Sequence, residues 1–411
     1  MEASTSSKQK STSSVHDVTS EKPPFGSRFL TDEAAVWTQN AWDHVPPPDD
    51  QDEIIAASLL KQRSAPVPED DKHKYNERPA RHWDNFYRMM STNFFRDRKW
   101  LHNEFRELMS ATEVEVSPSF LFACTTANPR NPSQAGPMTI LEVGCGTGAA
   151  MFPLLSSNQN PNLSLRAYDY SKHAVKLFQE NDLYKAPPCG TIVADVWDLT
   201  SETLPEGVEP ESADIVIMVF VFSALHPDEW TRAVTNIHKV LKPGGLLLLR
   251  DYGRYDMAQL RFKGGRLLDE NFYIRGDKTR VYFFELDELA LLFTGARAQP
   301  STQPPIVTQI VEDDSEPNDT PIPTPPSESD EIQPPPIDSP EPEQEPAPTP
   351  PSPQPAPQIH PSLLSSPPAA LFATEQLGVD RRLLLNRKRQ VKMYRVWMQA
   401  KFRKLSPPPG T

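Results

Sequence analysis

The residues best suited to chemistry are a glycine-rich run, Glu142-Val-Gly144-Cys-Gly146-Thr-Gly148, and an acid beyond it. Glycines let the backbone turn sharply and approach a ligand closely, and the start of the following helix offers unpaired N–H donors. Asp169 follows Gly148 by 21 residues, a spacing at which a carboxylate can hold both hydroxyls of a ribose. With the next alanine, the run also matches the GxGxxG/A pattern of dinucleotide-binding proteins. Alone, it therefore indicates a nucleotide-like ligand without choosing one.

Two further acids favour one ligand. Glu142 opens the loop, where its charge would repel a pyrophosphate but suits amino and sulfonium groups. Asp195 ends a later apolar run, in a position to reach an adenine edge. We therefore predict S-adenosylmethionine rather than NAD, held by Glu142, Gly144, Gly146, Gly148, Asp169 and Asp195. The alternative, that an acid faces solvent at the end of a strand and binds no ligand, stays open for each acid taken singly.

The elements that must position these residues alternate along the chain. Short apolar runs indicate strands at residues 139–143, 163–168, 191–194, 214–222 and 246–249, and helices are expected at 152–155, 174–181 and 229–241. A Lys-Pro-Gly-Gly segment at 242–245 is a helix stop. Residues 393–403 alternate apolar and polar side chains, as in a half-buried strand. This order predicts an α/β fold with a mostly parallel, doubly wound sheet.

Aromatic residues crowd the segment 82–108, which is helical in character. Trp83 and Tyr87 are four residues apart and so share one helix face. By residue type alone, core packing is the better explanation for both side chains.

A proline-rich acidic segment interrupts the chain. Residues 298–370 hold 23 of the 46 prolines, 12 Asp or Glu, and no Lys or Arg. Such a composition offers too little apolar surface to offset the entropy of ordering, so we expect disorder. We divide the chain into a disordered leader (1–24), an N-terminal arm and linker (25–81), a catalytic domain (82–297), the insertion (298–370), C-terminal strands that complete the domain (371–405) and a tail (406–411).

Charge and cysteines exclude several protein classes. The insertion carries −12 of the net charge of −13, so the rest of the chain sums to −1 and a nucleic-acid ligand stays open. Ten Lys or Arg stand against one acid in residues 380–404, which favours RNA contact over a solvated strand face. The three cysteines form no CxxC motif, so we expect neither disulfides nor a metal site. The absence of a signal or membrane segment predicts an intracellular protein in the cytoplasm, with the nucleus as second candidate.

These motifs carry a family resemblance. The glycine run, Asp169 and the Lys-Pro-Gly-Gly segment resemble Rossmann-like class I methyltransferases. The segments 83–87, 94–101, 250–256, 261–263, 271–277 and 279–284 are narrower and resemble the tRNA N3-methylcytidine methyltransferases. The segments 25–30, 40–43, 380–382, 386–387 and 393–397 resemble the branch that acts on threonine tRNA. The resemblance covers nearly all of the chain outside the leader, parts of the linkers and the insertion.

The resemblance implies methylation of N3 of cytidine 32 in the tRNA anticodon loop, with S-adenosylmethionine as donor and no metal. It implies a mostly parallel sheet with an antiparallel C-terminal strand. It also implies that the cofactor is held by Trp83, Tyr87, Gly144, Asp169, Asp195, Val196 and Val219. An aminoacyl-tRNA synthetase or another helper protein is a candidate partner, besides the tRNA itself.

The reaction needs positioning more than acid–base chemistry. N3 of neutral cytosine has a free lone pair, so the base has only to be turned into a pocket beside the methyl donor. The methylated base is a cation, which favours a carboxylate nearby. We predict Asp251 and Tyr252 as the catalytic pair; an ion pair with an arginine is an equal alternative for Asp251. His226 is set aside as a turn cap. The RNA-binding candidates are Arg96, Arg98, Lys99, Arg254, Arg261, Arg387, Lys388 and Arg389.

Two other functions remain open at this stage. A methyltransferase for a small molecule or a protein would share the glycine loop but not the aromatic segment or the basic terminus. A non-catalytic interaction protein would use proline-rich clusters of the insertion as ligands for aromatic grooves. Deleting residues 300–368 separates that reading, and we expect methylation to survive.

Overall fold

The fold is built on one eight-stranded sheet. The computed structural model describes residue 30 and residues 33–90, 95–113, 136–298, 359–365, 368–387 and 390–406. The strand order is β1-β10-β11-β6-β5-β2-β3-β4. The predicted leader, most of the insertion and the end of the tail lie outside the described residues.

Five neighbouring strands run parallel and form the predicted doubly wound part: β2 (Met138–Val143), β3 (Leu163–Asp169), β4 (Thr191–Val196), β5 (Ala213–Val219) and β6 (Leu241–Tyr252). Two expected boundaries are wrong. β5 ends at Val219 because Phe220 has a φ of 60°, which an extended strand cannot continue. The strand expected at 246–249 is longer, since β6 begins at Leu241 and includes the Lys-Pro-Gly-Gly segment, while the preceding helix ends at Val240 as that segment predicts.

Hydrophobic cores cover both faces of this sheet. In β5, for example, Ile215 and Ile217 face one core while Val216 and Met218 face the other, as strand alternation requires. Helices α4 (Leu101–Glu104), α5 (Arg106–Thr112), α7 (Met151–Ser157) and α8 (Lys172–Gln179) cover the first face. Helices α10 (Trp230–Val240), α12 (Leu286–Thr294) and α13 (Pro361–Ser365) cover the second.

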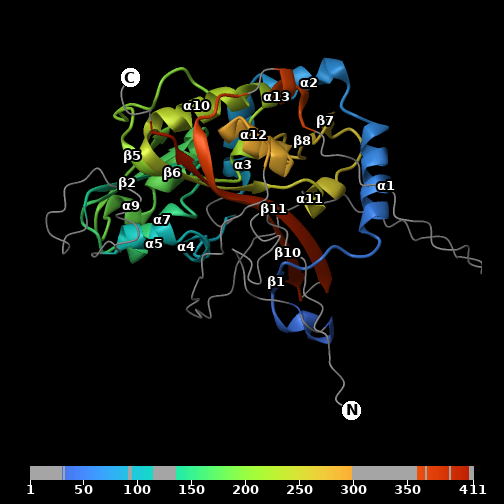
Figure 1. Cartoon of the computed structure of the whole chain (residues 1–411), viewed down its shortest axis with the longest axis horizontal. Coiled ribbons are helices and arrows are strands. Elements are labelled where there is room, and N and C mark those ends of the chain that lie inside the picture. The colour runs from blue at the N-terminus through green and yellow to red at the C-terminus, as the bar shows by residue number, and fades with distance from the viewer. Residues whose placement is uncertain are drawn as a thin grey trace, which may run out of the picture.

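The C-terminal strands extend the sheet in the antiparallel sense. β11 (Val391–Lys404) pairs with β6, β10 (Phe372–Asn386) pairs with β11, and β1 (Ala41–Asp43) pairs with β10. In Figure 1, β10 and β11 reach away from the helices toward β1. The antiparallel C-terminal strand is thus confirmed, but the half-buried expectation is wrong. Residues 395–400 are buried on both faces, because charged side chains there are paired inside the protein.

The N-terminal part contains more helix than the sequence predicts. It forms η1 (Glu33–Thr38), α1 (Gln51–Arg63), α2 (Glu69–Asn76) and α3 (Pro79–Met90). The single helix expected at 82–108 is wrong, since α3 ends at Met90 and α4 begins at Leu101. α1 and α2 were missed because neither has a clear apolar face; only acids in their first turns and bases in their last turns marked them.

Smaller elements complete the domain. They are α9 (Asp182–Lys185), η2 (Phe222–Ala224), η3 (Pro227–Glu229), α11 (Met257–Leu260) and a second sheet of β7 (Leu267–Asp269), β8 (Phe272–Ile274) and β9 (Arg280–Tyr282). β9 contacts η2, which follows the carboxyl end of β5. The second sheet therefore stands at the edge where open α/β sheets bind ligands.

Candidate active site

The glycine loop follows β2 and has a geometry that only glycine adopts easily. Gly144, Gly146 and Gly148 have φ values of 68°, 54° and 93°. The Gly146 N–H donates a hydrogen bond to Asp169 Oδ2 at 2.8 Å. A Cβ atom on Gly146 would lie 2.7 Å from Tyr87 Oη. The loop is therefore shaped to meet both the end of β3 and the helix α3.

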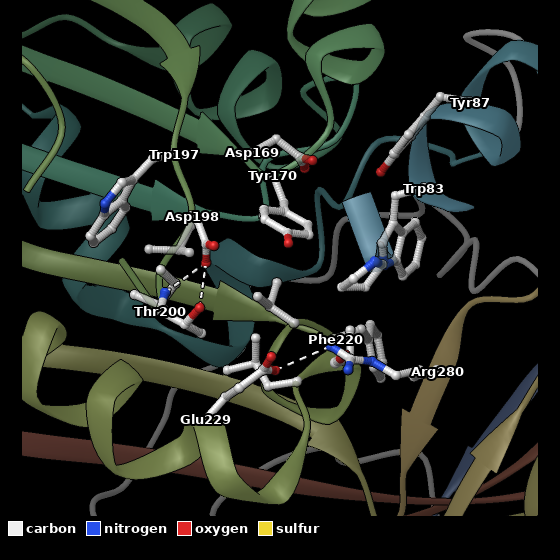
Figure 2. A pocket seen from close by; sticks show the side chains of 17 residues that line it. Trp83, Tyr87, Asp169, Tyr170, Trp197, Asp198, Thr200, Phe220, Glu229 and Arg280 are labelled. Carbon is white, nitrogen blue, oxygen red and sulfur yellow. Dashed lines mark hydrogen bonds and ion pairs between the residues drawn. The ribbon is translucent and has the colours of Figure 1, made fainter. Parts of the chain in front are cut away.

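Helix α3 is fastened across the loop by Asp84. Asp84 Oδ1 accepts hydrogen bonds from Ser171 Oγ at 2.6 Å and from the His173 N–H at 3.2 Å. Ser171 in turn caps α8, accepting from the Ala174 N–H at 3.2 Å. This fixed contact holds Trp83 and Tyr87, one turn apart, over the ends of the strands (Figure 2).

Two adjoining cavities open at this edge and share Trp83, Tyr87, Gly144, Phe220 and Ala224. The first holds about 700 Å³ including its open mouth, within the range of small-molecule sites. Figure 2 shows Asp169, Tyr170, Trp197, Asp198 and Arg280 around it. The second is lined by the glycine loop and by several polar and aromatic side chains: Phe95, Arg98, Val219, Tyr252, Arg275, Asp277 and Thr279.

The three predicted carboxylates do not all line this cleft. Asp169 does, and its two oxygens accept N–H groups from Gly146 and Ser171. Burial raises the pKa of Asp169 to about 6, against the lowering effect of these hydrogen bonds. Asp195 is exposed on the edge strand and caps the Val196 N–H at 2.7 Å. Neither Asp195 nor Val196 is among the lining residues, although Trp197, which follows β4, lines the first cavity.

Glu142 lies behind the glycine loop rather than in it. Its side chain is fully buried, and neither carboxylate oxygen has a hydrogen-bond partner among the described residues. The nearest charge is Arg98, whose Nη1 is 3.8 Å from Glu142 Oε1. Burial raises the pKa of Glu142 to about 8, although Arg98 lowers it. A buried carboxylate without hydrogen bonds is costly, which keeps Glu142 a candidate to bind a cationic group although it lines neither cavity.

Arg98, predicted to bind RNA, stands in the cleft instead. Its side chain is 15% exposed and lines the second cavity. The guanidinium lies 6.0 Å from the Phe95 ring centre and 5.9 Å from that of Phe220. Arg98 is thus placed to act on a small ligand beside Glu142.

Phe220 was not predicted, yet it lines both cavities. Its left-handed backbone is held by the N–H, which donates to the Arg250 carbonyl oxygen at 2.8 Å. Its ring lies 4.7 Å from that of Tyr252. Such a conformation costs on the order of 1–3 kcal/mol and is typical of functional sites. In the sequence, only its place at the end of a buried strand could have marked it.

Asp251 and Tyr252, the predicted catalytic pair, are placed differently from each other. Tyr252 lines the second cavity. Asp251 is buried behind it and accepts the N–H groups of Ser223 at 2.9 Å and of Tyr252 at 2.8 Å. Burial raises the pKa of Asp251 to about 6. Asp251 therefore positions the strand ends and does not line the cleft.

Of the other RNA-binding candidates that the structure describes, Arg254 is fixed inside the protein and the rest are exposed. Arg254 is buried and paired with Glu285 at 2.7 Å and Glu270 at 3.5 Å, so it is not available to phosphates. Arg387 is exposed and donates to the Thr38 carbonyl oxygen at 3.3 Å. Arg96, Lys99 and Arg261 are exposed, and Lys388 and Arg389 lie outside the described residues.

The basic C-terminal segment is largely structural, contrary to expectation. Five of its ten basic residues form ion pairs within the domain: Arg382 with Asp43, Glu104 and Asp380, Arg395 with Asp256, Lys401 with Glu107, Arg403 with Glu375, and Lys404 with Glu211. Most of the paired acids are distant in sequence, so the density of Lys and Arg in this segment could not show that five of these side chains are paired within the protein. Within this segment, the exposed Arg387 at the turn between β10 and β11 stays a candidate for RNA contact.

The remaining sequence predictions concern His226, metal ions and membrane helices. His226 caps η3, its Nδ1 accepting from the Asp228 N–H at 3.3 Å, as its position before a proline suggests. No cluster of three or more His, Cys, Asp or Glu suited to a metal occurs in the parts of the chain that the structure describes. Over the same residues, no helix has the length and apolarity to cross a membrane.

Known proteins are similar to this chain, both over one domain and over nearly its whole length. A family model described as a methyltransferase domain matches residues 141–247. The tRNA N(3)-methylcytidine methyltransferase of Schizosaccharomyces pombe is 36% identical over 97% of this chain and 98% of its own. The tRNA N(3)-cytidine methyltransferase METTL2 of Danio rerio is 35% identical, covering 94% and 91%. The tRNA(Thr) (cytosine(32)-N(3))-methyltransferase of Saccharomyces cerevisiae is 38% identical over 92% of this chain, which spans only 45% of that longer protein.

A solved SAM-dependent methyltransferase from Methanosarcina mazei aligns over 71% of this chain and all of its own, with 15% identity and a TM-score of 0.36. That score is low, and the fold assignment rests on the strand order and directions, which are those of a Rossmann-like class I methyltransferase. Because two relatives are matched almost from end to end at 35–36% identity, the chain belongs to the family of tRNA N3-cytidine methyltransferases.

Proposed function

We propose that this protein methylates N3 of cytidine 32 in the anticodon loop of a set of tRNAs that includes threonine tRNA, using S-adenosylmethionine. The observation that carries the proposal is the end-to-end similarity to relatives named for tRNA N3-cytidine methylation. A further relative is named for cytosine 32 of threonine tRNA.

The cleft residues fit S-adenosylmethionine. This donor supplies a methyl group on a sulfonium, and it carries an adenosine and an amino acid. Asp169 keeps acceptor capacity for ribose hydroxyls, because a carboxylate has about four acceptor positions and two are in use. Trp83 and Tyr87 offer aromatic surface, and the glycine loop permits close approach. We further assign Gly148, Asp195, Val196 and Val219 to this site, of which Val219 lines the second cavity.

Glu142 and Arg98 suit the amino acid end of the donor. The buried Glu142 carboxylate lacks the hydrogen bonds that an ammonium group would provide. Arg98 presents a guanidinium on the cleft side of the same carboxylate, where it can pair with the donor's carboxylate. This assignment replaces the RNA role predicted for Arg98.

The chain contributes position rather than a general base. The cytosine N3 lone pair attacks directly, so the aromatic walls of Phe220 and Tyr252 have to hold the base and exclude water. Tyr252 remains the candidate that contacts the base. Asp251 keeps its role through Tyr252, whose N–H it holds, and its negative charge favours the cationic product.

The tRNA backbone would lie along exposed bases outside the cleft. We propose Arg96, Lys99, Arg261, Arg387, Lys388 and Arg389 as phosphate contacts, with the cytoplasm as the place of action and a synthetase or other helper as a candidate partner. Arg387 lies at the turn between β10 and β11, near the N-terminal arm.

Nucleoside analysis tests the proposal directly. Purified protein, S-adenosylmethionine and tRNA lacking the modification should yield 3-methylcytidine, detected by mass spectrometry and mapped to position 32. Methylation of protein or small molecules with none in tRNA would overturn the proposal in favour of the second enzyme reading. Absence of any methyl transfer with intact cofactor binding would favour an interaction protein.

A further inference from the structure

The second cavity has a polar rim to which the proposed cofactor site assigns no role. The loop 275–279 joins β8 to β9 and brings Arg275, Asp277 and Thr279 to the cavity that Phe220 and Tyr252 line. The Arg275 guanidinium carbon is 5.5 Å from the Tyr252 ring centre. An aromatic wall beside donor and acceptor groups is the arrangement by which proteins read a base turned out of its stack.

This loop is fixed by its own hydrogen bonds. The Arg275 N–H donates to the Thr279 carbonyl oxygen at 2.8 Å, and the Lys278 N–H donates to the Arg275 carbonyl oxygen at 3.0 Å. Asp277 Oδ1 accepts from both the Thr279 N–H at 2.8 Å and Thr279 Oγ1 at 2.7 Å. The polar groups are therefore held in place before any ligand arrives, which lowers the cost of binding.

Each polar side chain keeps capacity for a ligand. Within the described residues, Arg275 donates only from Nη1, to Thr279 Oγ1 at 3.3 Å and to the Arg280 carbonyl oxygen at 3.2 Å. Its other nitrogens retain donors. Asp277 accepts these hydrogen bonds from Thr279 on Oδ1, so Oδ2 retains acceptor positions. One fixed donor and one fixed acceptor thus line the same cavity.

We infer that Arg275 and Asp277 read the Watson–Crick edge of the target base and select cytosine over uracil, an assignment that rests on the proposed function. Asp277 accepts a hydrogen bond from the exocyclic N4 amine, and Arg275 donates to O2. N3, between these two groups, keeps its lone pair for the methyl group. Uracil carries an acceptor at position 4 and a hydrogen on N3, so it would face the carboxylate with the wrong polarity.

The substitution Asp277→Asn tests this with little disturbance. The asparagine carbonyl oxygen can still accept from Thr279, so the turn is kept, while the other atom becomes a donor facing N4. We expect kcat/KM on cytidine-32 tRNA to fall about 10–100-fold, with unchanged S-adenosylmethionine affinity by calorimetry. Asp269→Asn, at an exposed acid outside the cavity, is the matched control and should match the wild type.

A substrate analogue shows whether the contact is direct. An anticodon stem-loop carrying a pyrimidin-2-one riboside at position 32 lacks the N4 amine. If Asp277 binds that amine, the wild type should lose activity on the analogue, whereas Asp277→Asn should lose little more than it has already lost. Changes in the reactivity of N3 affect both proteins equally and cancel from the comparison.

The outcomes are distinct. Wild-type protein that makes no 3-methylcytidine in tRNA would sink the proposed function itself. Wild-type activity with an unaffected Asp277→Asn variant would overturn only the base-reading role. So would two losses that simply multiply, or a variant that no longer binds the cofactor, since Asp277 would then act on the structure alone.

Discussion

At the scale of single residues, the buried Glu142 carboxyl makes the stability of the fold depend on pH. Its side chain is buried without a hydrogen-bond partner among the described residues, and its pKa is raised to about 8, first by burial. A carboxyl group whose pKa is raised by folding stabilises the fold fully below its ordinary pKa of 4.5. That contribution is lost as the pH rises toward about 8.

The substitution Glu142→Gln should therefore stabilise the ligand-free protein and weaken cofactor binding. Above pH 8 we expect the Tm to rise by a few °C, on the order of 1 kcal/mol, because no buried charge forms. At pH 5 the two proteins should melt together. Calorimetric Kd for S-adenosylmethionine should rise at least about 10-fold. Equal or lower Tm at pH 8 with unchanged Kd would contradict a ligand role for this carboxylate.

A second pH prediction concerns Asp169. Ligand affinity should rise with pH, whereas the contribution of Glu142 to stability falls with pH. Burial raises the pKa of Asp169 to about 6, and only the ionised form offers all its acceptors to ribose hydroxyls. Affinity for S-adenosylmethionine should therefore rise as pH increases from 5 to 7. Asp169→Asn should flatten this profile and raise the Kd about 10–100-fold. The exposed Asp182→Asn serves as the comparison and should keep the wild-type profile.

At the scale of elements, a buried arginine joins β6 to the C-terminal strands. Arg250 is 1% exposed and lies between the rings of Trp100 and Trp397, 4.5 Å from each centre. Its Nη2 is 2.5 Å from Asp380 Oδ2. Burial alone would raise the pKa of Asp380, but Arg382 and Arg250 outweigh it and lower that pKa. The backbone carbonyl oxygen of Arg250 also accepts a hydrogen bond from the N–H of the strained Phe220.

Removing Arg250 should therefore affect both the fold and the cleft. Arg250→Ala leaves Asp380 with less compensation, and we expect a loss of about 3–5 kcal/mol in the free energy of unfolding, measured by urea titration. Lys392→Ala, at an exposed position of β11, should change it by less than about 0.5 kcal/mol. Similar losses of unfolding free energy for both variants would show that the contacts of Arg250 with Trp100 and Trp397 do not hold the strands together.

Arg387, Lys388 and Arg389 are the C-terminal candidates for contact with RNA. Reversing the charge of Arg387, Lys388 and Arg389 to Glu should weaken tRNA binding and reduce the slope of log K against log salt concentration. Filter binding at several salt concentrations measures both. Cofactor affinity should stay unchanged, because Arg387 is exposed and lines neither cavity. Unaltered tRNA binding would refute this surface.

At the scale of the molecule, the two sides of the proline-rich insertion are fastened to one helix. The Ala298 N–H donates to Asp287 Oδ1 at 3.2 Å, and the His360 N–H donates to Glu288 Oε1 at 2.9 Å. Residues 359–365, which the sequence assigns to the insertion, are described, and Ile359 and Leu363 are buried in the core. The chain therefore leaves and re-enters the domain at neighbouring points.

Two deletions should behave differently. Replacing residues 300–357 by a short Gly-Ser linker should keep the Tm and methylation, because closing a shorter loop costs little. Removing residues 300–368 also removes Ile359 and Leu363, and we expect a loss of several kcal/mol in the free energy of unfolding. Thermal melting and methylation assays measure both. Loss of methylation by the shorter deletion, with an unchanged Tm, would assign the insertion a direct role.

The sequence by itself determined the parallel strands, the glycine loop and the acid after the second strand. These features are local, since apolar runs, glycines and strand-end acids lie within short stretches of chain. The family resemblance brought Trp83 and Tyr87 to the site, where residue type alone favours the core. Phe220 was not predicted because its strained backbone depends on a hydrogen bond that its N–H donates to the Arg250 carbonyl oxygen in β6.

Tertiary structure alone decided which charges are free to act. Arg254, Arg382 and Arg395 look like RNA contacts in sequence, but acids from distant segments neutralise them. Arg98 likewise lines the second cavity, where Glu142 from β2 lies 3.8 Å away. Ion pairs form between residues close in space, and sequence spacing carries no record of them. The candidate site is therefore a product of local pattern for its backbone and of long-range packing for its charge.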